Sequence, residues 1–195
     1  MSETREIIIV KPLVPDLLAD YLAFFDGEAF ANNPEWAGCY CYFNHAQHNL
    51  KPWEERTPNG NRTAASMLIE GRQMSGYMAY VGRRVVGWCN AGPRARYTTL
   101  DNATEPELDK IGSIMCFIVA PEFRRQGVAT FLLDAACMGM ARLGLTIAEA
   151  YPRQAAQTDA GHYHGPLSMY LENGFEVVSE EGGVTTVRKS LVVSN

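Results

Sequence analysis

A short basic segment that contains a glycine is the first place where this sequence could do chemistry. It reads Arg124-Arg125-Gln126-Gly127-Val128-Ala129-Thr130 and lies between an apolar run and an amphipathic run. The first N–H groups of a helix have no intrahelical partner and lie at the positive end of the helix dipole, so they attract anions. Gly127 and Ala129 put no bulky side chain between those N–H groups and a ligand. The segment therefore predicts a binding site for a diphosphate group.

The flanking residues predict the elements that would position this segment. Residues 114–119 form a continuous apolar run with Pro121 behind it, which is typical of a strand buried on both faces. After the segment, apolar residues recur at spacings of three and four, which predicts one buried stripe of a helix that ends near Arg142 and Gly144. The residues of this stripe are Val128, Phe131, Leu132, Ala135 and Met138. Because Gly-x-Gly-x-x-Gly and Gly-x4-Gly-Lys-Ser/Thr are both missing, a Rossmann or P-loop nucleotide site is not supported.

A second motif follows further along the chain, Tyr170-Leu171-Glu172-Asn173-Gly174-Phe175. Taken together and in this order, the two motifs resemble those of the GNAT N-acetyltransferases. In that family the coenzyme loop follows the pattern Arg/Gln-x-x-Gly-x-Gly/Ala, which Arg124, Gly127 and Ala129 match, and a Tyr-x-x-x-Gly-Phe segment lies at the last helix. The resemblance covers residues 76–191, whereas residues 1–75 match only in general layout.

The resemblance implies an α/β (α+β) fold built on a single mixed, mostly antiparallel twisted sheet. Such a sheet has about six to seven strands, carries helices on both faces and has splayed central strands. We expect a single domain over residues 1–195, with the acetyl-CoA core at about 76–191 and acceptor-side elements at about 12–75. A chain of 195 residues is also an ordinary length for one domain.

The resemblance also implies an activity, the acetyl-CoA-dependent transfer of an acetyl group to a primary amine of a small molecule, directly in a ternary complex. By resemblance, the main chain of Phe117, Ile118 and Val119 pairs with the pantetheine arm of the coenzyme. The residues implied to hold the pyrophosphate are Arg124, Arg125, Gln126, Gly127, Val128, Ala129 and Thr130. Tyr170 is implied as the proton donor to the departing thiolate. The alternative is a protein of this fold that binds acyl-CoA without catalysis and serves as a sensor or interaction module.

The general base is left open by the sequence. Certain family members carry a glutamate on the central strand at the position of Ser113, so that assignment does not transfer. Glu149 on the neighbouring strand could act through water, and His162 and His164 have ordinary pKa values suited to proton transfer near neutrality. Tyr163 is a further departure, since many members have asparagine at that position.

Residues 32–61 are irregular and aromatic, which predicts a wall of the acceptor site; the alternative is that these aromatic residues pack the loop onto the core. Cys39, Cys41, His45 and His48 are of the residue types that bind zinc. One residue between two cysteines is tight for two ligands of one tetrahedron, so no metal is predicted, and packing or substrate contact is favoured.

Arg94 and Arg96 could face the coenzyme phosphates or solvent.

Composition narrows the possible partners. The formal net charge of −5 argues against a generic binder of nucleic acid or of anionic membranes. The cysteines are odd in number and several lie singly in apolar segments, which predicts reduced thiols. With neither a signal-peptide pattern nor an apolar run long enough to span a bilayer, a cytoplasmic location is expected. The expected partner is a small-molecule amine, and whether the chain forms a homodimer is left open by the sequence.

Overall fold

The computed structural model describes residues 7–153 and 163–191. Its strands form one seven-stranded sheet in the order β1-β2-β3-β4-β5-β7-β6. β4 and β5 are parallel, and every other neighbouring pair is antiparallel. This arrangement confirms the predicted mixed, mostly antiparallel sheet. The strands are β1 (Ile8–Pro12), β2 (Gly76–Val81), β3 (Arg84–Pro93), β4 (Ile111–Val119), β5 (Ile147–Ala150), β6 (Glu176–Glu181) and β7 (Val184–Ser190).

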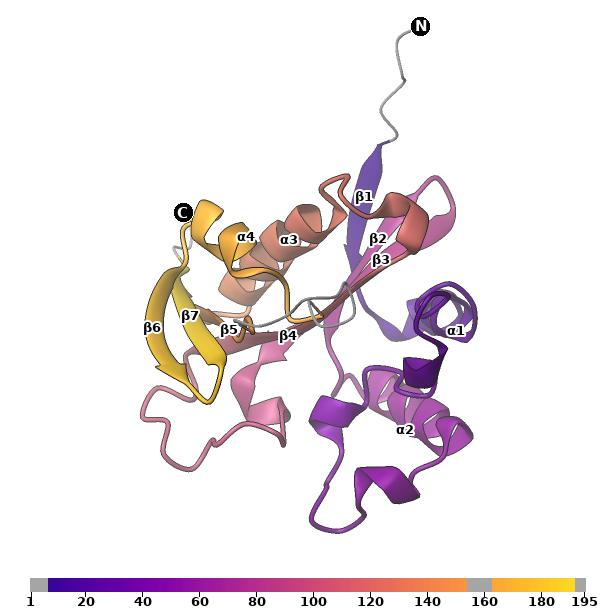
Figure 1. The fold of residues 1–195 in the computed structure, drawn as a ribbon, viewed down its shortest axis with the longest axis horizontal. Helices are drawn as coiled ribbons and strands as arrows, with labels where there is room; N and C mark the ends of the chain where they lie inside the picture. Colours follow the sequence, from indigo (N-terminus) through magenta and orange to yellow (C-terminus); the bar gives the residue numbers. More distant parts are fainter. Residues whose placement is uncertain (1–6, 154–162, 192–195) are drawn as a thin grey trace, which may run out of the picture.

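Helices cover both faces of the sheet, as Figure 1 shows. α3 (Val128–Arg142) and α4 (Leu167–Glu172) pack on one face, in an apolar cluster that includes Phe117 and Tyr170. α1 (Leu18–Asp26) and α2 (Pro58–Glu70) pack on the other face, in a cluster that includes Trp88. From Cys116 to Val119 the side chains of β4 alternate between the two clusters, because side chains of a strand point to opposite faces. β4 is therefore the central strand that both layers share.

The buried face of α3 differs from the predicted stripe. Val128 and Leu132 are buried as predicted, but Phe131 is 50% exposed and Met138 is 55% exposed. A helix turns by about 100° per residue, so a face centred on the fourfold spacing Leu132, Ala136 and Met140 leaves Phe131 and Met138 on the opposite side. The prediction for these two residues was wrong. Apolar residues at three- and four-residue spacing can be grouped into more than one stripe around this helix, and the spacing alone does not say which stripe is buried.

The central strands part after a short stretch of pairing. β4 pairs with β5 from Ile111↔Ile147 to Ile114↔Ala150, and β4 then continues to Val119. Beyond this pairing the β5 side of β4 is bonded to other parts of the chain. The Phe117 N–H donates to the carbonyl oxygen of Tyr163 at 2.6 Å, and the Val119 carbonyl accepts from Arg124 Nε at 3.1 Å. The splay of the central strands thus leaves part of β4 without a partner strand on the β5 side, and we call this part, residues 115–119, the free edge of β4.

The irregular segment before α2 folds as a series of short 3-10 turns, Pro34–Trp36, Phe43–His45 and Trp53–Glu55. Between the first two turns, Tyr40 and Cys41 adopt φ values of 46° and 47°, a left-handed conformation that is uncommon for residues other than glycine. Both side chains are buried. Within residues 7–153 and 163–191, no helix combines the length and apolar character needed to cross a membrane.

Candidate active site

A cavity of about 380 Å³ lies where the free edge of β4 meets the start of α3. It brings together all but one of the residues predicted to bind the coenzyme. The exception is Gln126, whose side-chain amide donates instead to the Glu122 carbonyl oxygen at 2.7 Å. The predicted residues that line the cavity are Phe117, Ile118, Val119, Arg124, Arg125, Gly127, Val128, Ala129 and Thr130.

The start of α3 is open toward this cavity. Gly127 is the N-cap of the helix, with a φ of 82°, and no side chain caps the first turn. A Cβ atom at Gly127 would meet only one ring atom of Phe131, at 3.9 Å. Arg125 precedes it in a left-handed conformation with a φ of 59°. The unpaired N–H groups of the first turn and two arginines thus surround a space that suits an anion.

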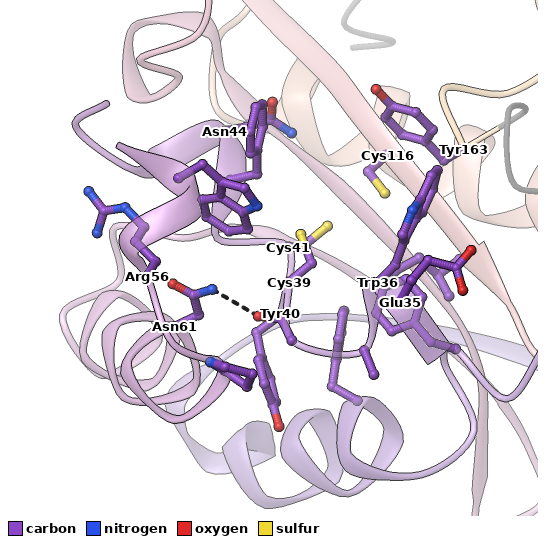
Figure 2. A pocket seen from close by; sticks show the side chains of 18 of the residues that line it. Glu35, Trp36, Cys39, Tyr40, Cys41, Asn44, Arg56, Asn61, Cys116 and Tyr163 are labelled. Carbon is purple, nitrogen blue, oxygen red and sulfur yellow. Dashed lines mark hydrogen bonds between the residues drawn. The ribbon is translucent and has the colours of Figure 1, made fainter. Parts of the chain in front are cut away.

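A larger cavity of about 820 Å³ lies on the α1 and α2 side of β4. Its walls come from the irregular segment before α2, from the end of α1 and from Cys116 and Ile118 of β4 (Figure 2). Aromatic rings contribute much of this wall, with centroids 5.4 Å apart for Trp36 and Tyr163 and 5.0 Å apart for Phe43 and Trp53. The two cavities share the lining residues Phe30, Trp36, Ile118 and Tyr163, so they adjoin across the central strand.

Tyr170 lies beneath the coenzyme-side cavity, and the lining of neither cavity includes it. Its ring packs between Phe117 and Phe175, with centroids at 6.4 and 5.2 Å. Its hydroxyl donates to the His164 carbonyl oxygen at 2.6 Å. Burial raises the pKa of Tyr170 well above its ordinary value, so the phenol keeps its proton at neutral pH.

Glu149 is placed in a buried polar network rather than beside either cavity. One carboxylate oxygen accepts from Arg94 and from the Tyr151 hydroxyl, and the other accepts from Arg188 Nε at 2.6 Å. Only 1% of the Glu149 side chain is exposed. Both oxygens are thus engaged, and the geometry argues against the predicted role as base. Sequence reasoning missed this network, and Arg94 is buried by it rather than facing solvent or phosphates.

His164 is the remaining predicted base within the described residues, since His162 lies outside them. Burial, followed by the charge of Arg153, lowers the pKa of His164 to about 4. Its Nδ1 atom is buried and has no hydrogen-bond partner within the described chain. The ring is therefore neutral at physiological pH and keeps a nitrogen able to accept a proton, although His164 lines neither cavity.

The cysteine and histidine residues considered for zinc do not gather into a metal site. Among residues 7–153 and 163–191, no group of three or more Cys, His, Asp or Glu side chains is arranged to hold a metal ion. His45 bonds to the Arg96 carbonyl oxygen at 3.2 Å and His48 to the Phe43 carbonyl oxygen at 2.8 Å. Cys39, Cys41 and, unexpectedly, Cys116 line the larger cavity as free thiols.

Comparison with known proteins identifies the class of protein that carries this site. The model of the acetyltransferase (GNAT) family matches residues 30–165. Because the match spans well over half of the chain, the chain belongs to this family. The finding confirms the predicted family and the predicted class of enzyme, an acyltransferase. A comparison with curated protein sequences gave no significant match.

Several solved structures with the same fold are distant from this chain in sequence. The PaiA N-acetyltransferase of Thermoplasma acidophilum, solved in complex with coenzyme A, is 15% identical, with a TM-score of 0.56 over 94% of this chain and 99% of that one. An N-acetyltransferase from Staphylococcus aureus Mu50 is 15% identical, with a TM-score of 0.59 over 95% and 99%. The yncA protein of Salmonella typhimurium, solved with acetyl-CoA, is 14% identical, with a TM-score of 0.56 over 95% and 94%. At these identities the likeness establishes the fold.

Two half-buried histidines, His45 and His164, predict how stability depends on pH. Burial lowers the pKa of both His45 and His164 to about 4, below the ordinary value of about 6.5 that applies to the unfolded chain. Between about pH 6.5 and 4 the unfolded chain therefore takes up protons that the folded protein refuses. The free energy of unfolding should fall with falling pH in this window, by up to about 1.4 kcal/mol per pH unit for each histidine.

Urea unfolding at several pH values measures this slope. A His45→Gln variant, whose amide can still donate to the Arg96 carbonyl, should show a shallower slope than the wild type between pH 6.5 and 4. Equal slopes for the two proteins would contradict the assigned pKa of His45.

Proposed function

We propose that this protein is an acetyl-CoA-dependent N-acetyltransferase that acts on a primary amine of a small molecule, with both substrates bound at once. The observation that carries the proposal is the meeting of two cavities at the free edge of β4. A cosubstrate held on one side and an acceptor held on the other would meet beside Ile118 without either having to leave. That geometry supports direct transfer in a ternary complex.

The smaller cavity suits coenzyme A. The open first turn of α3, with Arg124 and Arg125 beside it, can hold a diphosphate through N–H groups and positive charge. The free edge of β4 offers main-chain groups at Phe117 and Val119 that a pantetheine amide can pair with, as an added strand would. Each of these groups is now bonded within the chain, so pantetheine would replace the Tyr163 carbonyl at Phe117.

The larger cavity suits the acceptor. At about 820 Å³ it falls within the range of roughly 300–1,000 Å³ typical of small-molecule sites. Aromatic walls can hold the apolar part of a ligand, and Glu35 lies along the lining, where its carboxylate can attract a cationic amine. The coenzyme supplies an acetyl thioester, and the attacking nitrogen must be neutral when it reacts.

Tyr170 and His164 are the groups we assign to proton transfer. Tyr170 stays protonated because burial raises its pKa, and its ring packs against Phe117, which lines the coenzyme-side cavity. It is our candidate for the donor to the departing thiolate. His164 is neutral, with a pKa of about 4, and is our candidate for the group that accepts the amine proton, directly or through water.

A second candidate, an acyl-CoA-binding sensor without turnover, is favoured by the bonds that occupy the catalytic groups. The Tyr170 hydroxyl is committed to the His164 carbonyl, and both oxygens of Glu149 are committed to arginines. A thiol-release assay with acetyl-CoA and a panel of primary amines separates the two functions. Release above the rate of hydrolysis with at least one amine supports the transferase, whereas tight coenzyme binding without release on any amine supports the sensor.

Replacing Tyr170 with phenylalanine should lower kcat by about 10²-fold, the low end of acid catalysis because a thiolate leaves readily. The KM for acetyl-CoA should change little, since the hydroxyl lines neither cavity. Steady-state kinetics on the best amine of the panel provides the measurement. Tyr97→Phe is the matched control, because its hydroxyl is also buried and bonded, to Asn90 Oδ1 at 3.0 Å. Unchanged kcat in Tyr170→Phe would remove Tyr170 from the mechanism.

A further inference from the structure

Three of the free thiols face one space, the larger cavity. Cys39 and Cys41 come from the loop before α2, and Cys116 comes from β4, more than seventy positions later in the chain. Figure 2 shows their sulfur atoms directed toward the interior of the cavity. Cys116 is the strand partner of Asn90 on β3, the Asn90 amide donates to the Cys41 carbonyl oxygen at 3.3 Å, and both cysteines belong to the same apolar cluster. The fold thus brings together a pair of thiols that a small solute in the cavity can reach.

The surroundings of Cys41 favour its thiolate form. The side chain of Cys116, and further those of Trp88 and Asn90, lower the pKa of Cys41 against the effect of burial. The Trp88 indole N–H is completely buried and has no hydrogen-bond partner in the described chain. A buried donor without a partner is rare and costly, and Trp88 is one of the groups that lower the pKa of Cys41.

The other two thiols of the cavity differ from Cys41. Hydrogen bonding to Cys41, followed by burial, raises the pKa of Cys116 well above its ordinary value. Burial raises the pKa of Cys39 to about 12. Since the thiolate is the nucleophile in thiol chemistry, Cys41 is the attacking group of the three, and Cys116 is a protonated thiol that lines the same cavity.

The backbone at Cys41 has an unusual conformation that sets the direction of its side chain. Tyr40 and Cys41 both hold the left-handed conformation, which is unfavourable for residues other than glycine and persists only where the surrounding structure enforces it. The Tyr40 hydroxyl bonds to Asp26 at 2.7 Å, and the Cys41 carbonyl accepts from Asn90 Nδ2 at 3.3 Å. These bonds hold the loop so that the Cys41 side chain meets β4.

We propose that Cys41 and Cys116 form a peroxide-reactive dithiol, a modification site at which a hydroperoxide converts the pair into a reversible disulfide. The Cys41 thiolate attacks one peroxide oxygen, so an S–O bond forms, the O–O bond breaks and hydroxide leaves. Sulfur loses two electrons in this step and the peroxide gains them. Cys116 then loses its proton and attacks the Cys41 sulfur, so that an S–S bond forms, the S–O bond breaks and the oxygen leaves as water. A thiol reductant reverses the reaction.

This inference does not depend on acetyl transfer, because the modification is read from the covalent state of the chain. The full-length protein, freed of reductant, is treated with hydrogen peroxide and then alkylated, digested and analysed by mass spectrometry without reduction. We expect a cross-linked peptide pair that joins Cys41 to Cys116, with loss of two hydrogen atoms, and recovery of both thiols after reduction. A cross-link between Cys39 and Cys41, or no cross-link while other cysteines oxidise, would overturn the proposal.

Single variants separate the role of Cys41, which attacks the peroxide, from the role of Cys116, which closes the disulfide. In Cys116→Ser the sulfenic acid at Cys41 should persist and be trapped by a 1,3-dicarbonyl probe, whereas Cys41→Ser should give neither adduct nor cross-link. Cys39→Ser and Cys137→Ser are the matched controls and should cross-link like the wild type. A probe adduct on Cys116 in Cys41→Ser, formed as fast as the adduct on Cys41, would show that the surroundings of Cys41 confer no reactivity.

The buried indole N–H provides a second test of the same site. Trp88→Phe keeps an aromatic ring but removes the buried N–H, and loss of its stabilisation of the Cys41 thiolate should slow probe labelling of Cys41 by about tenfold at neutral pH. Circular dichroism and the unfolding midpoint report whether the variant is folded, and labelling in the Cys116→Ser background isolates Cys41. An unchanged labelling rate in a folded Trp88→Phe protein would contradict the proposed stabilisation.

Discussion

Replacing Gly127 with glutamate should weaken acetyl-CoA binding by about 10³-fold. The variant places a carboxylate where the first turn of α3 opens into the coenzyme-side cavity, so it would compete for the N–H groups and repel the diphosphate. Losing about two charge-assisted hydrogen bonds of roughly 1.5–3 kcal/mol each accounts for this size of effect. Calorimetric titration of the folded variant with acetyl-CoA gives the change in Kd.

Gly144→Glu is the matched control for this variant. Gly144 follows the other end of α3, has a φ of 83° against 82° for Gly127, and has open space around its Cβ position. Both variants therefore add the same charge and the same left-handed strain, but only one does so at the proposed anion site. Equal loss of affinity in the two proteins would mean that strain or net charge, and not the start of α3, governs binding.

Replacing Glu149 with alanine should lower the free energy of unfolding by about 3–5 kcal/mol, the usual cost of removing one partner from a buried ion pair. The substitution leaves Arg94, which is itself buried, without its carboxylate. It also removes one of the two carboxylates bound by Arg188, which keeps its contact with Glu105 at 2.6 Å. Urea unfolding followed by circular dichroism measures the change.

Two further variants give this prediction its controls. Glu107→Ala breaks an exposed pair with Lys110, at 3.3 Å, and should cost less than about 1 kcal/mol. The double variant Arg94→Met/Glu149→Met should recover much of the lost stability, since apolar residues often replace a buried ion pair without penalty. A Glu149→Ala protein as stable as the wild type would show that the network contributes little to the fold.

Local sequence was enough to predict the elements around the coenzyme-side cavity. Pro121, Gly127 and Gly144 mark the end of β4 and the two ends of α3, and each acts through its own backbone conformation. Gln126 lies outside the cavity lining because its side chain turns back to the Glu122 carbonyl oxygen. The spacing of residues does not reveal whether such a side chain bonds to its own loop or points into the cavity.

Contacts between distant residues could not be predicted in the same way. Arg94 lies in a polar stretch that resembles a solvated loop, yet its charge is buried against Glu149, a residue 55 positions away. Cys116 appears in the sequence as one apolar residue of a buried strand, and only the pairing of β3 with β4 and the fold of the preceding loop bring it to Cys41. These features depend on the order of strands in the sheet, which periodicity does not specify.

Hydrogen exchange of the wild-type protein with and without acetyl-CoA tests the central claim most directly. If the start of α3 binds the diphosphate and the free edge of β4 binds pantetheine, the coenzyme should slow exchange at the amides of residues 127–130 and 117–119. The first turn of α2, which starts at Pro58 and is already capped by the Thr57 side chain, should exchange at an unchanged rate. Binding that protects neither α3 nor β4, or that protects both helices equally, would contradict the account.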